Sequence, residues 1–229
     1  MNTQNMKIIA LLPMKGNSER VPNKNLKDFA GKPLYHRVMN VLLSSKYIDK
    51  VIVNTDSKII KEDLSKHFLE DVIIIDRPQN IVGDMVSMNK IIECDINSVK
   101  ADFYLQTHST NPLLTSASID NAVEKMFSLN KEGIYDSIFS VTKLQTRLYT
   151  KTGEPFNHNP HELLRTQDLE PLYEENSNFY IFTKDSFDKS GGKRIGNAPF
   201  MFEIDKIEAV DIDEPQDFII AEAIFKLLS

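Results

Sequence analysis

The segment Lys7–Asn25, KIIALLPMKGNSERVPNKN, places an apolar run directly before a basic loop. Residues 7–12 are almost all aliphatic, without polar alternation, which predicts a short strand buried on both faces of a parallel sheet. Lys15, Arg20 and Lys24 then crowd into the loop, although the whole chain has a net charge of -6. The loop after the first strand of such a sheet is the usual place for nucleotide phosphates. The segment therefore predicts an α/β fold with an anion-binding loop at one edge of its sheet.

The rest of the chain alternates short apolar runs with segments of helical periodicity. The expected strands are 7–12, 50–54, 72–75, 102–106, 136–141, 178–183 and 207–210, and the expected helices are 33–45, 57–68, 85–99, 116–129 and one that begins at Pro215. This alternation predicts a three-layer sandwich with a mostly parallel, Rossmann-like sheet. Ligands of such sheets bind beyond the carboxyl ends of the strands. Four loops are expected to meet there: 13–25, 54–57, 76–87 and 106–115.

The composition excludes several classes of protein. The chain of 229 residues is 41% hydrophobic and 26% charged, which is ordinary for a globular protein with one sizeable core. An excess of acidic residues argues against broad nucleic-acid binding. A single cysteine, Cys94, cannot form an internal disulfide, and no apolar stretch approaches the length of a membrane span. We therefore expect a cytoplasmic protein that binds neither nucleic acid nor membrane.

The alternation is interrupted over residues 142–178. This segment is polar and rich in Pro and Asn, and a structureless loop of its length is unusual inside a compact domain. Its scattered apolar side chains include Phe156 and Leu163, which need a surface to cover. We expect an arm that leaves the main sheet, with a turn around Gly153.

Two acidic residues lie in the segment VDIDEPQDF, residues 210–218. In an extended chain Asp211 and Asp213 point the same way, and two converging carboxylates suit Mg²⁺ beside phosphates. An alternative is that Asp213 caps the helix that begins at Pro215, which would explain one aspartate and not both.

The basic loop offers further groups suited to a phosphate. Gly16 allows close backbone approach, Ser18 supplies a hydroxyl, and Lys15 and Lys24 are spaced to lie on either side of a triphosphate. The alternative is a solvated loop without a ligand. Together with the aspartate pair, the loop has what phosphoryl chemistry on a nucleotide needs.

The basic loop LLPMKGNSERVPNKN resembles the first motif of the acylneuraminate cytidylyltransferases. Further matches follow in chain order: VIVNTDS (51–57), RPQNIVGD (77–84) with Ser87, LQ before a Ser/Thr/Pro loop (105–115), NSNFYIF (176–182) and VDIDEPQDF (210–218). The resemblance spans nearly the whole chain. It implies one nucleotidyltransferase domain over residues 1–229, with the arm 142–178 inserted within it.

The resemblance also implies an activity and the residues that carry it. The family joins CMP from CTP to an acidic sugar and releases pyrophosphate, usually as a homodimer whose arm reaches the neighbouring site. The nucleotide-binding residues would be Lys15, Gly16, Ser18, Lys24, Asn25, Asp84 and Ser87. The acceptor-binding residues would be Gln106, Arg165, Glu174 and Tyr180. The catalytic residues would be Lys15, Lys24, Asp211 and Asp213, the last two as ligands of Mg²⁺.

The sequence departs from the family pattern in its acceptor half. Leu114 and Glu174 stand where sialate enzymes tend to carry arginine, the natural partner of a sugar carboxylate. This predicts a retained reaction with an acceptor other than N-acetylneuraminate. Arg147, Arg165 or His108 could replace the missing cations.

Three other functions are weaker alternatives. A sugar-1-phosphate nucleotidyltransferase expects a glycine-rich start that residues 16–20 do not supply. A nucleotide-sugar glycosyltransferase expects an acceptor half after its aspartate pair, whereas only residues 214–229 follow here. A non-catalytic nucleotide-binding module has no need of both Lys24 and the aspartates.

Overall fold

A seven-stranded sheet forms the centre of the computed structural model, which describes residues 6–228. The strands are β1 (Ile8–Leu11), β4 (Lys50–Thr55), β5 (Val72–Asp76), β6 (Phe103–Thr107), β7 (Ser137–Leu144), β8 (Leu172–Phe182) and β9 (Pro199–Glu203). The α-helices are α1 (Tyr35–Leu43), α2 (Lys58–His67), α3 (Met88–Ser98), α4 (Ser116–Glu132), α5 (Lys184–Lys189) and α6 (Pro215–Leu228). Smaller elements are the hairpin of β2 (Asp28–Phe29) and β3 (Lys32–Pro33), and the 3-10 turns η2 (Lys24–Leu26), η3 (Gln79–Ile81) and η4 (Thr166–Asp168).

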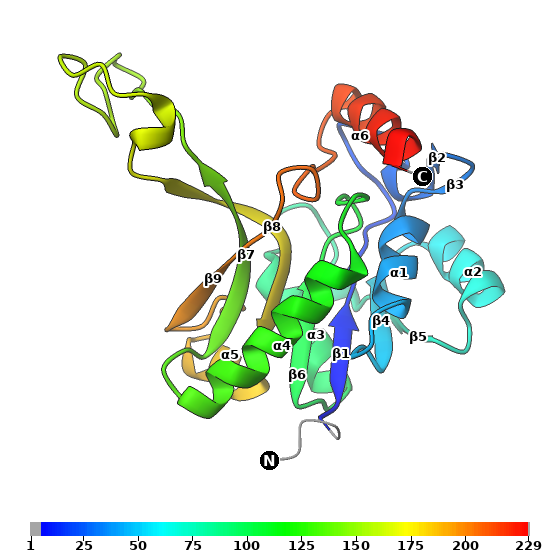
Figure 1. Cartoon of the computed structure of the whole chain (residues 1–229). Coiled ribbons are helices and arrows are strands. Elements are labelled where there is room, and N and C mark those ends of the chain that lie inside the picture. The colour runs from blue at the N-terminus through cyan, green and yellow to red at the C-terminus, as the bar shows by residue number, and fades with distance from the viewer. Residues whose placement is uncertain (1–5, 229) are drawn as a thin grey trace.

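The strand order in the main sheet is β5-β4-β1-β6-β8-β7-β9. The first four of these strands run parallel, β8 runs antiparallel to both β6 and β7, and β9 runs parallel to β7. Helices cover both faces (Figure 1). The prediction of a three-layer α/β sandwich with a mostly parallel sheet is confirmed.

The apolar run of β1 is buried on both sides. Ile8 and Ala10 pack in one cluster with side chains of α1, α2 and α4, while Ile9 and Leu11 pack in a second cluster with α3 and α5. All four side chains are almost fully buried, and burying one large aliphatic side chain contributes roughly 1.5–3 kcal/mol. Double burial explains why this strand has no polar alternation.

Ser57 ends the loop after β4 and caps α2, because its hydroxyl accepts a hydrogen bond from the amide of Ile60. The helix expected over residues 57–68 is therefore observed, with its first helical residue at Lys58. The predicted start of the next helix at Met85 is wrong, since α3 begins at Met88 and Met85 is 98% exposed. Gly83, at φ 125°, turns the chain before this helix, and residues 84–87 remain in the loop.

The predicted strand over residues 207–210 is also wrong. The Asp205 side chain accepts a hydrogen bond from the amide of Ile207, and the Asp205 carbonyl accepts one from Ala209, so the segment forms a turn. The strand in this part of the chain is β9, which adds to the sheet edge beside β7.

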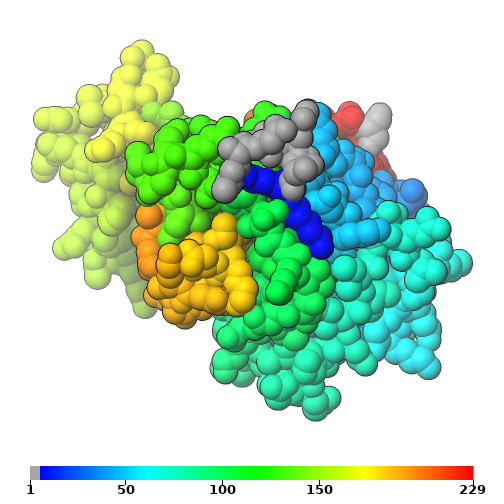
Figure 2. Space-filling model, turned by 90° about the horizontal axis from the view of Figure 1, so that it is seen from below, coloured from blue at the N-terminus to red at the C-terminus, as the bar shows by residue number. Residues whose placement is uncertain are grey.

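Strands β7 and β8 continue beyond the body of the sheet as a two-stranded ribbon that ends at the pair Leu144–Leu172. Residues 145–171 project from its end as an arm (Figures 1 and 2). A bridge between Tyr149 and Pro155 closes the expected turn around Gly153. Several apolar side chains of the arm are exposed: Tyr149, Phe156, Leu163, Leu164 and Tyr173.

The C-terminal helix α6 packs against the β2–β3 hairpin. Phe218 and Ala221 are buried beside Phe29, Leu34 and Ile212, while Leu228 at the end of the helix is exposed. Across residues 6–228 we find no helix with both the length and the apolar character needed to span a membrane.

Candidate active site

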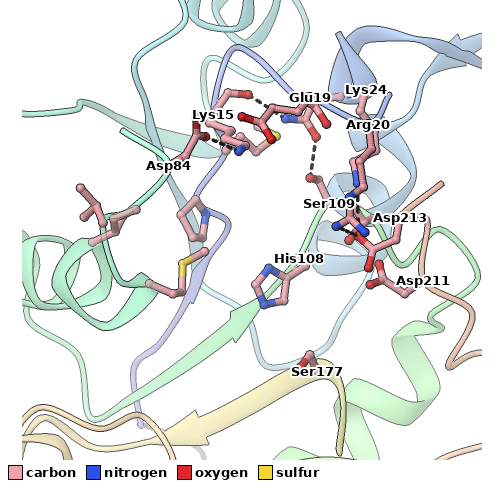
Figure 3. A pocket seen from close by; sticks show the side chains of 18 of the residues that line it. Lys15, Glu19, Arg20, Lys24, Asp84, His108, Ser109, Ser177, Asp211 and Asp213 are labelled. Atoms are coloured by element: carbon pink, nitrogen blue, oxygen red, sulfur yellow. Dashed lines mark hydrogen bonds and ion pairs between the residues drawn. The ribbon is translucent and has the colours of Figure 1, made fainter. Parts of the chain in front are cut away.

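A cavity of about 660 Å³ opens at the carboxyl ends of β1, β5 and β6. Its wall comes from loops 13–25, 76–87 and 106–115, together with side chains from the β8 bulge and the segment before α6 (Figure 3). Arg194, from the loop before β9, also lines the cavity. The volume falls within the range of small-molecule sites, about 300–1,000 Å³. The fourth expected loop, 54–57, lies behind the wall and supports it, because the amide of Gly16 donates to Asp56 Oδ1 over 2.8 Å.

The loop after β1 is held in place by its packing against Ser57 and by the side chain of Asn25. A Cβ atom on Gly16 would lie 2.9 Å from the Cβ of Ser57, so the close approach that requires glycine is to α2. Asn25 donates to the Lys15 carbonyl over 3.0 Å and accepts from the Ser109 hydroxyl over 2.7 Å. Ser18 and Asn25 line the cavity, whereas Gly16 does not.

The cations of this loop face carboxylates across the cavity. Lys15 Nζ lies 2.6 Å from Asp84 Oδ1, and Arg20 reaches Asp213 over 2.8 Å. Lys24 Nζ donates to the Ile212 carbonyl over 2.5 Å and lies 3.8 Å from Asp213 Oδ1. Burial lowers the pKa of Lys24, and the nearby Asp213 partly offsets this.

Asp211 and Asp213 both line the cavity, as predicted from their spacing of two residues in an extended segment. Burial of its carboxyl group raises the pKa of Asp211, a hydrogen bond from Thr110 opposes this, and the charge of Asp213 raises it further. The capping alternative is not supported, because Asp217 accepts hydrogen bonds from the amides of Asp213 and Glu214 at the start of α6. The carboxylate of Asp213 is thus available to the cavity and to Arg20.

Gln106 and Tyr180, two predicted acceptor residues, are buried behind the cavity wall. Arg194 covers both: its Nη1 donates to Gln106 Oε1 over 2.5 Å, and its guanidinium carbon lies 3.8 Å from the centre of the Tyr180 ring. Arg194 itself lines the cavity. Its sequence context does not single out this residue, since the surrounding GGKRIGN matches no motif.

Two further residues of the wall are His108 and Arg77. The pKa of His108 is lowered to about 3 by burial and by the charges of Arg194 and Lys24, so its ring is neutral near neutral pH and does not replace a missing cation. Arg77 donates to the carbonyls of Met14 and Asn54 and so fixes the start of the basic loop. Arg77 was within reach of sequence reasoning, because it opens the RPQNIVGD match.

The remaining predicted residues lie outside this cavity wall. Ser87 precedes α3 and lines a neighbouring hollow, and Glu174 lines another hollow that Asp211 also borders. Arg165 lies on the arm, 2.7 Å from Asp168. Leu114 is buried in the core beside α1 and α4, so the two positions that lack an expected arginine do not face the cavity in this chain.

The bulge in β8 adds one hydroxyl that the sequence analysis did not single out. The pairing of β7 with β8 shifts between Phe139 and Val141, and Ser177 takes φ 57° within the extra residues. This left-handed conformation is uncommon for a residue other than glycine. It brings Ser177 into the cavity wall (Figure 3).

A family model for cytidylyltransferases matches residues 9–224 of the chain. The chain belongs to this cytidylyltransferase family. The enzymes of the family use a divalent metal ion. Two carboxylates at one cavity, Asp211 and Asp213, are hard oxygen donors of the kind that hold such an ion beside phosphates.

Individual proteins resemble this cytidylyltransferase along its whole length. The pseudaminic acid cytidylyltransferase of Campylobacter jejuni is 24% identical over 229 residues, and the match covers 97% of each chain. The N-acylneuraminate cytidylyltransferase A of Danio rerio is 30% identical over 224 residues, which covers 94% of this chain and 50% of that protein. Among solved structures, a CMP:2-keto-3-deoxy-manno-octonic acid synthetase complexed with CTP has a TM-score of 0.69 at 12% identity, over 97% of this chain and 100% of that chain. The structural likeness supports the fold alone.

Proposed function

We propose that this cytidylyltransferase transfers CMP from CTP to a hydroxyl group of an acidic sugar of the nonulosonic acid class. The observation that carries the proposal is the cavity itself, which is lined by Lys15, Lys24, Asp211, Asp213 and Arg194. Cations, hard oxygen ligands and a separate arginine match a triphosphate, its metal ion and an acidic acceptor. The acids named for the similar proteins support this class of acceptor.

The nucleotide half of the cavity is assigned to the basic loop. Lys15, Ser18 and Lys24 contact the triphosphate, and Asn25 keeps the loop folded over it through its bonds to the Lys15 carbonyl and to Ser109. Gly16 contributes by its tight packing against α2. Asp84 and Ser87 belong to the segment before α3, on the side where the family reads the base.

In the reaction, the acceptor oxygen forms a bond to the α-phosphorus of CTP. The bond between this phosphorus and the oxygen that leaves with pyrophosphate breaks. The acceptor hydroxyl loses a proton in the process. Lys24, which is only 12% exposed, stabilises negative charge on the leaving pyrophosphate. We assign Asp211 and Asp213 to Mg²⁺, which supplies charge neutralisation and orientation of the phosphates when bound.

The arm supports a homodimer as part of this proposal. Its exposed apolar side chains include Phe156 at 66% and Leu163 at 96%, and such groups are stabilised by a covering surface. Arg165 and Glu174 lie on or near the arm, so they would reach an acceptor from the partner subunit or from a neighbouring hollow.

The test is pyrophosphate release by the purified protein with a panel of nucleotides and acceptors. We expect release with CTP and Mg²⁺ in the presence of pseudaminic acid or a related acid, and little with UTP or with neutral sugars. N-acetylneuraminate is expected to be a poorer acceptor. Release that depends on a neutral sugar 1-phosphate would favour the alternative nucleotidyltransferase, and tight CTP binding without any turnover would favour a binding module.

A further inference from the structure

Arg194 differs from the other cations of the cavity in its partners. Lys15 and Arg20 pair with carboxylates, while Lys24 and Arg77 donate to backbone carbonyls. Among the cavity-lining cations that the structure describes, Arg194 alone has neither kind of hydrogen-bond partner, because its guanidinium bonds to the amide oxygen of Gln106 and to the side chain of Tyr180. A guanidinium has five N–H donors in a planar fork, so most of its donors remain to be used.

The surroundings of Arg194 are poorly hydrated. Burial lowers its pKa, and the nearby Tyr180 and Glu175 only partly offset this. The adjacent His108 ring is neutral, and the hydroxyl of Tyr180 is engaged with Glu175. A desolvated cation without a paired carboxylate is costly, and an incoming anion relieves that cost.

The loop that carries Arg194 is anchored on both sides of it. The hydroxyl of Ser190 donates to the Lys193 carbonyl over 2.9 Å, and Ser137 donates to the carbonyl of Ile195. Gly196 follows at φ 71°, where a Cβ atom would lie 2.3 Å from Asp136 Oδ1. The backbone on either side of Arg194 is therefore fixed before any ligand arrives.

The partners of Arg194 also set the orientation of Gln106. Arginine offers no acceptor, so Gln106 must present its oxygen to Arg194. The Gln106 amide nitrogen then donates to the Thr107 carbonyl over 2.7 Å and lies 3.4 Å from His108 Nε2. Gln106 and Tyr180 thus hold the guanidinium of Arg194, and Arg194 lines the cavity.

We propose that Arg194 is the specificity-determining residue that binds the carboxylate of the acceptor. This rests on the proposed function, because it takes the acceptor to be an acidic sugar. A planar fork on a fixed loop is suited to a carboxylate in bidentate contact. The sequence lacks arginine at the two positions where related enzymes tend to carry it, and Arg194 supplies one from the loop before β9.

The experiment compares each acid with its own methyl ester, which is neutral and of similar shape. Pyrophosphate release is measured for N-acetylneuraminate and pseudaminic acid, as acid and ester, with the parent protein, Arg194→Gln and Arg194→Lys. A hydrogen bond to a charged group corresponds to roughly a ten- to hundredfold preference, so we expect the parent to favour the better acid over its ester by that factor in kcat/KM. Arg194→Gln should lose most of the preference, and Arg194→Lys should retain part of it.

The controls separate this role from a structural one. Lys193→Gln removes an exposed neighbouring charge that does not line the cavity, so it should keep the parent preference. CTP binding, measured by calorimetry, should be equal in all variants. An equal loss for acid and ester in Arg194→Gln would mean that Arg194 only supports Gln106 and Tyr180, and would overturn the proposal. If that variant does not fold, an unchanged preference in Arg194→Lys would also overturn it.

A failure of the proposed function gives a different result. In that case the parent itself releases no pyrophosphate with any acid, and the carboxylate assignment falls with it. A parent that is active on the acids and shows no preference for acid over ester contradicts the role of Arg194 alone.

Discussion

Replacement of Lys24 by methionine tests the least exposed of the three cavity-lining cations of the basic loop. Methionine keeps most of the aliphatic stem, so the packing of the side chain, which is 12% exposed, is largely preserved. The ammonium group and its bond to the Ile212 carbonyl are removed.

The separation between Lys24 and Asp213 gives a scale for the effect. A full negative charge 3.8 Å from this ammonium interacts by about 4 kcal/mol at an effective dielectric constant of about 20. If about half a charge develops on the leaving pyrophosphate, the transition state loses about 2 kcal/mol, or roughly thirtyfold in rate. Loss of one preorganised contact of this kind typically lowers kcat by about 10²–10³. We therefore expect a decrease in kcat between about thirtyfold and a thousandfold.

The assay is pyrophosphate release at saturating CTP, Mg²⁺ and acceptor. Lys32→Met is the matched control, because Lys32 is exposed on the small hairpin away from the cavity. A smaller change in the KM for CTP than in kcat is expected, since the charge is stabilised as the bond breaks. A kcat of Lys24→Met within about threefold of the parent, less than about 0.7 kcal/mol, would refute the assignment.

Three further predictions concern the metal ligands, the arm and a buried carboxyl group. Asp211→Asn and Asp213→Asn should each weaken Mn²⁺ binding, measured by electron paramagnetic resonance in the presence of CTP, and equal binding in both variants and parent would contradict the metal assignment. Leu163→Asp, on a side chain that is 96% exposed, should shift the protein from dimer to monomer in sedimentation without lowering its melting temperature; a parent that is already monomeric at micromolar concentration removes the premise. Asp95 is buried, with one oxygen bonded to Asn54 and the other unpaired, and burial raises its pKa from 3.8 to about 7. Its contribution to stability is therefore present below pH 3.8 and is lost as the pH rises to about 7, a loss of at most about 4 kcal/mol. Asp95→Asn should flatten the dependence of the unfolding free energy on pH over this window. Parallel curves for the variant and the parent would contradict this.

The sequence predicted the sheet well because its central strands are buried on both faces. Unbroken apolar runs such as residues 8–11 have few other structures available, and the capping residue Ser57 acts locally. Met85 was misjudged because it lies at helical spacing before the apolar residues of α3, although Gly83 turns the chain just before it. The segment 207–210 was misjudged because Asp205 satisfies its amides within a turn, a contact that no periodicity reveals.

The candidate site was predictable where its residues belong to one continuous segment. The loop cations and the pair Asp211 and Asp213 are close in sequence to the elements that place them. Arg194 was not predictable in this way, because its position depends on contacts between its loop and Asp136 and Ser137, which lie far back in the chain. Arginine in a loop of ordinary composition carries no signal until those contacts are known.

The ion pairs across the cavity affect the loss of side-chain entropy when a nucleotide binds. Lys15 and Arg20 line the cavity and form ion pairs with Asp84 and Asp213. These pairs are about half exposed, and an exposed pair is worth about 0–1 kcal/mol, so exchanging one carboxylate for a phosphate oxygen costs little. The lysine and arginine rotamers are restricted beforehand, which spares part of the roughly 0.5–1.5 kcal/mol of side-chain entropy that binding loses for each such residue. Under the proposed function, Asp84 and Asp213 hold Lys15 and Arg20 close to the positions where these cations would meet the triphosphate.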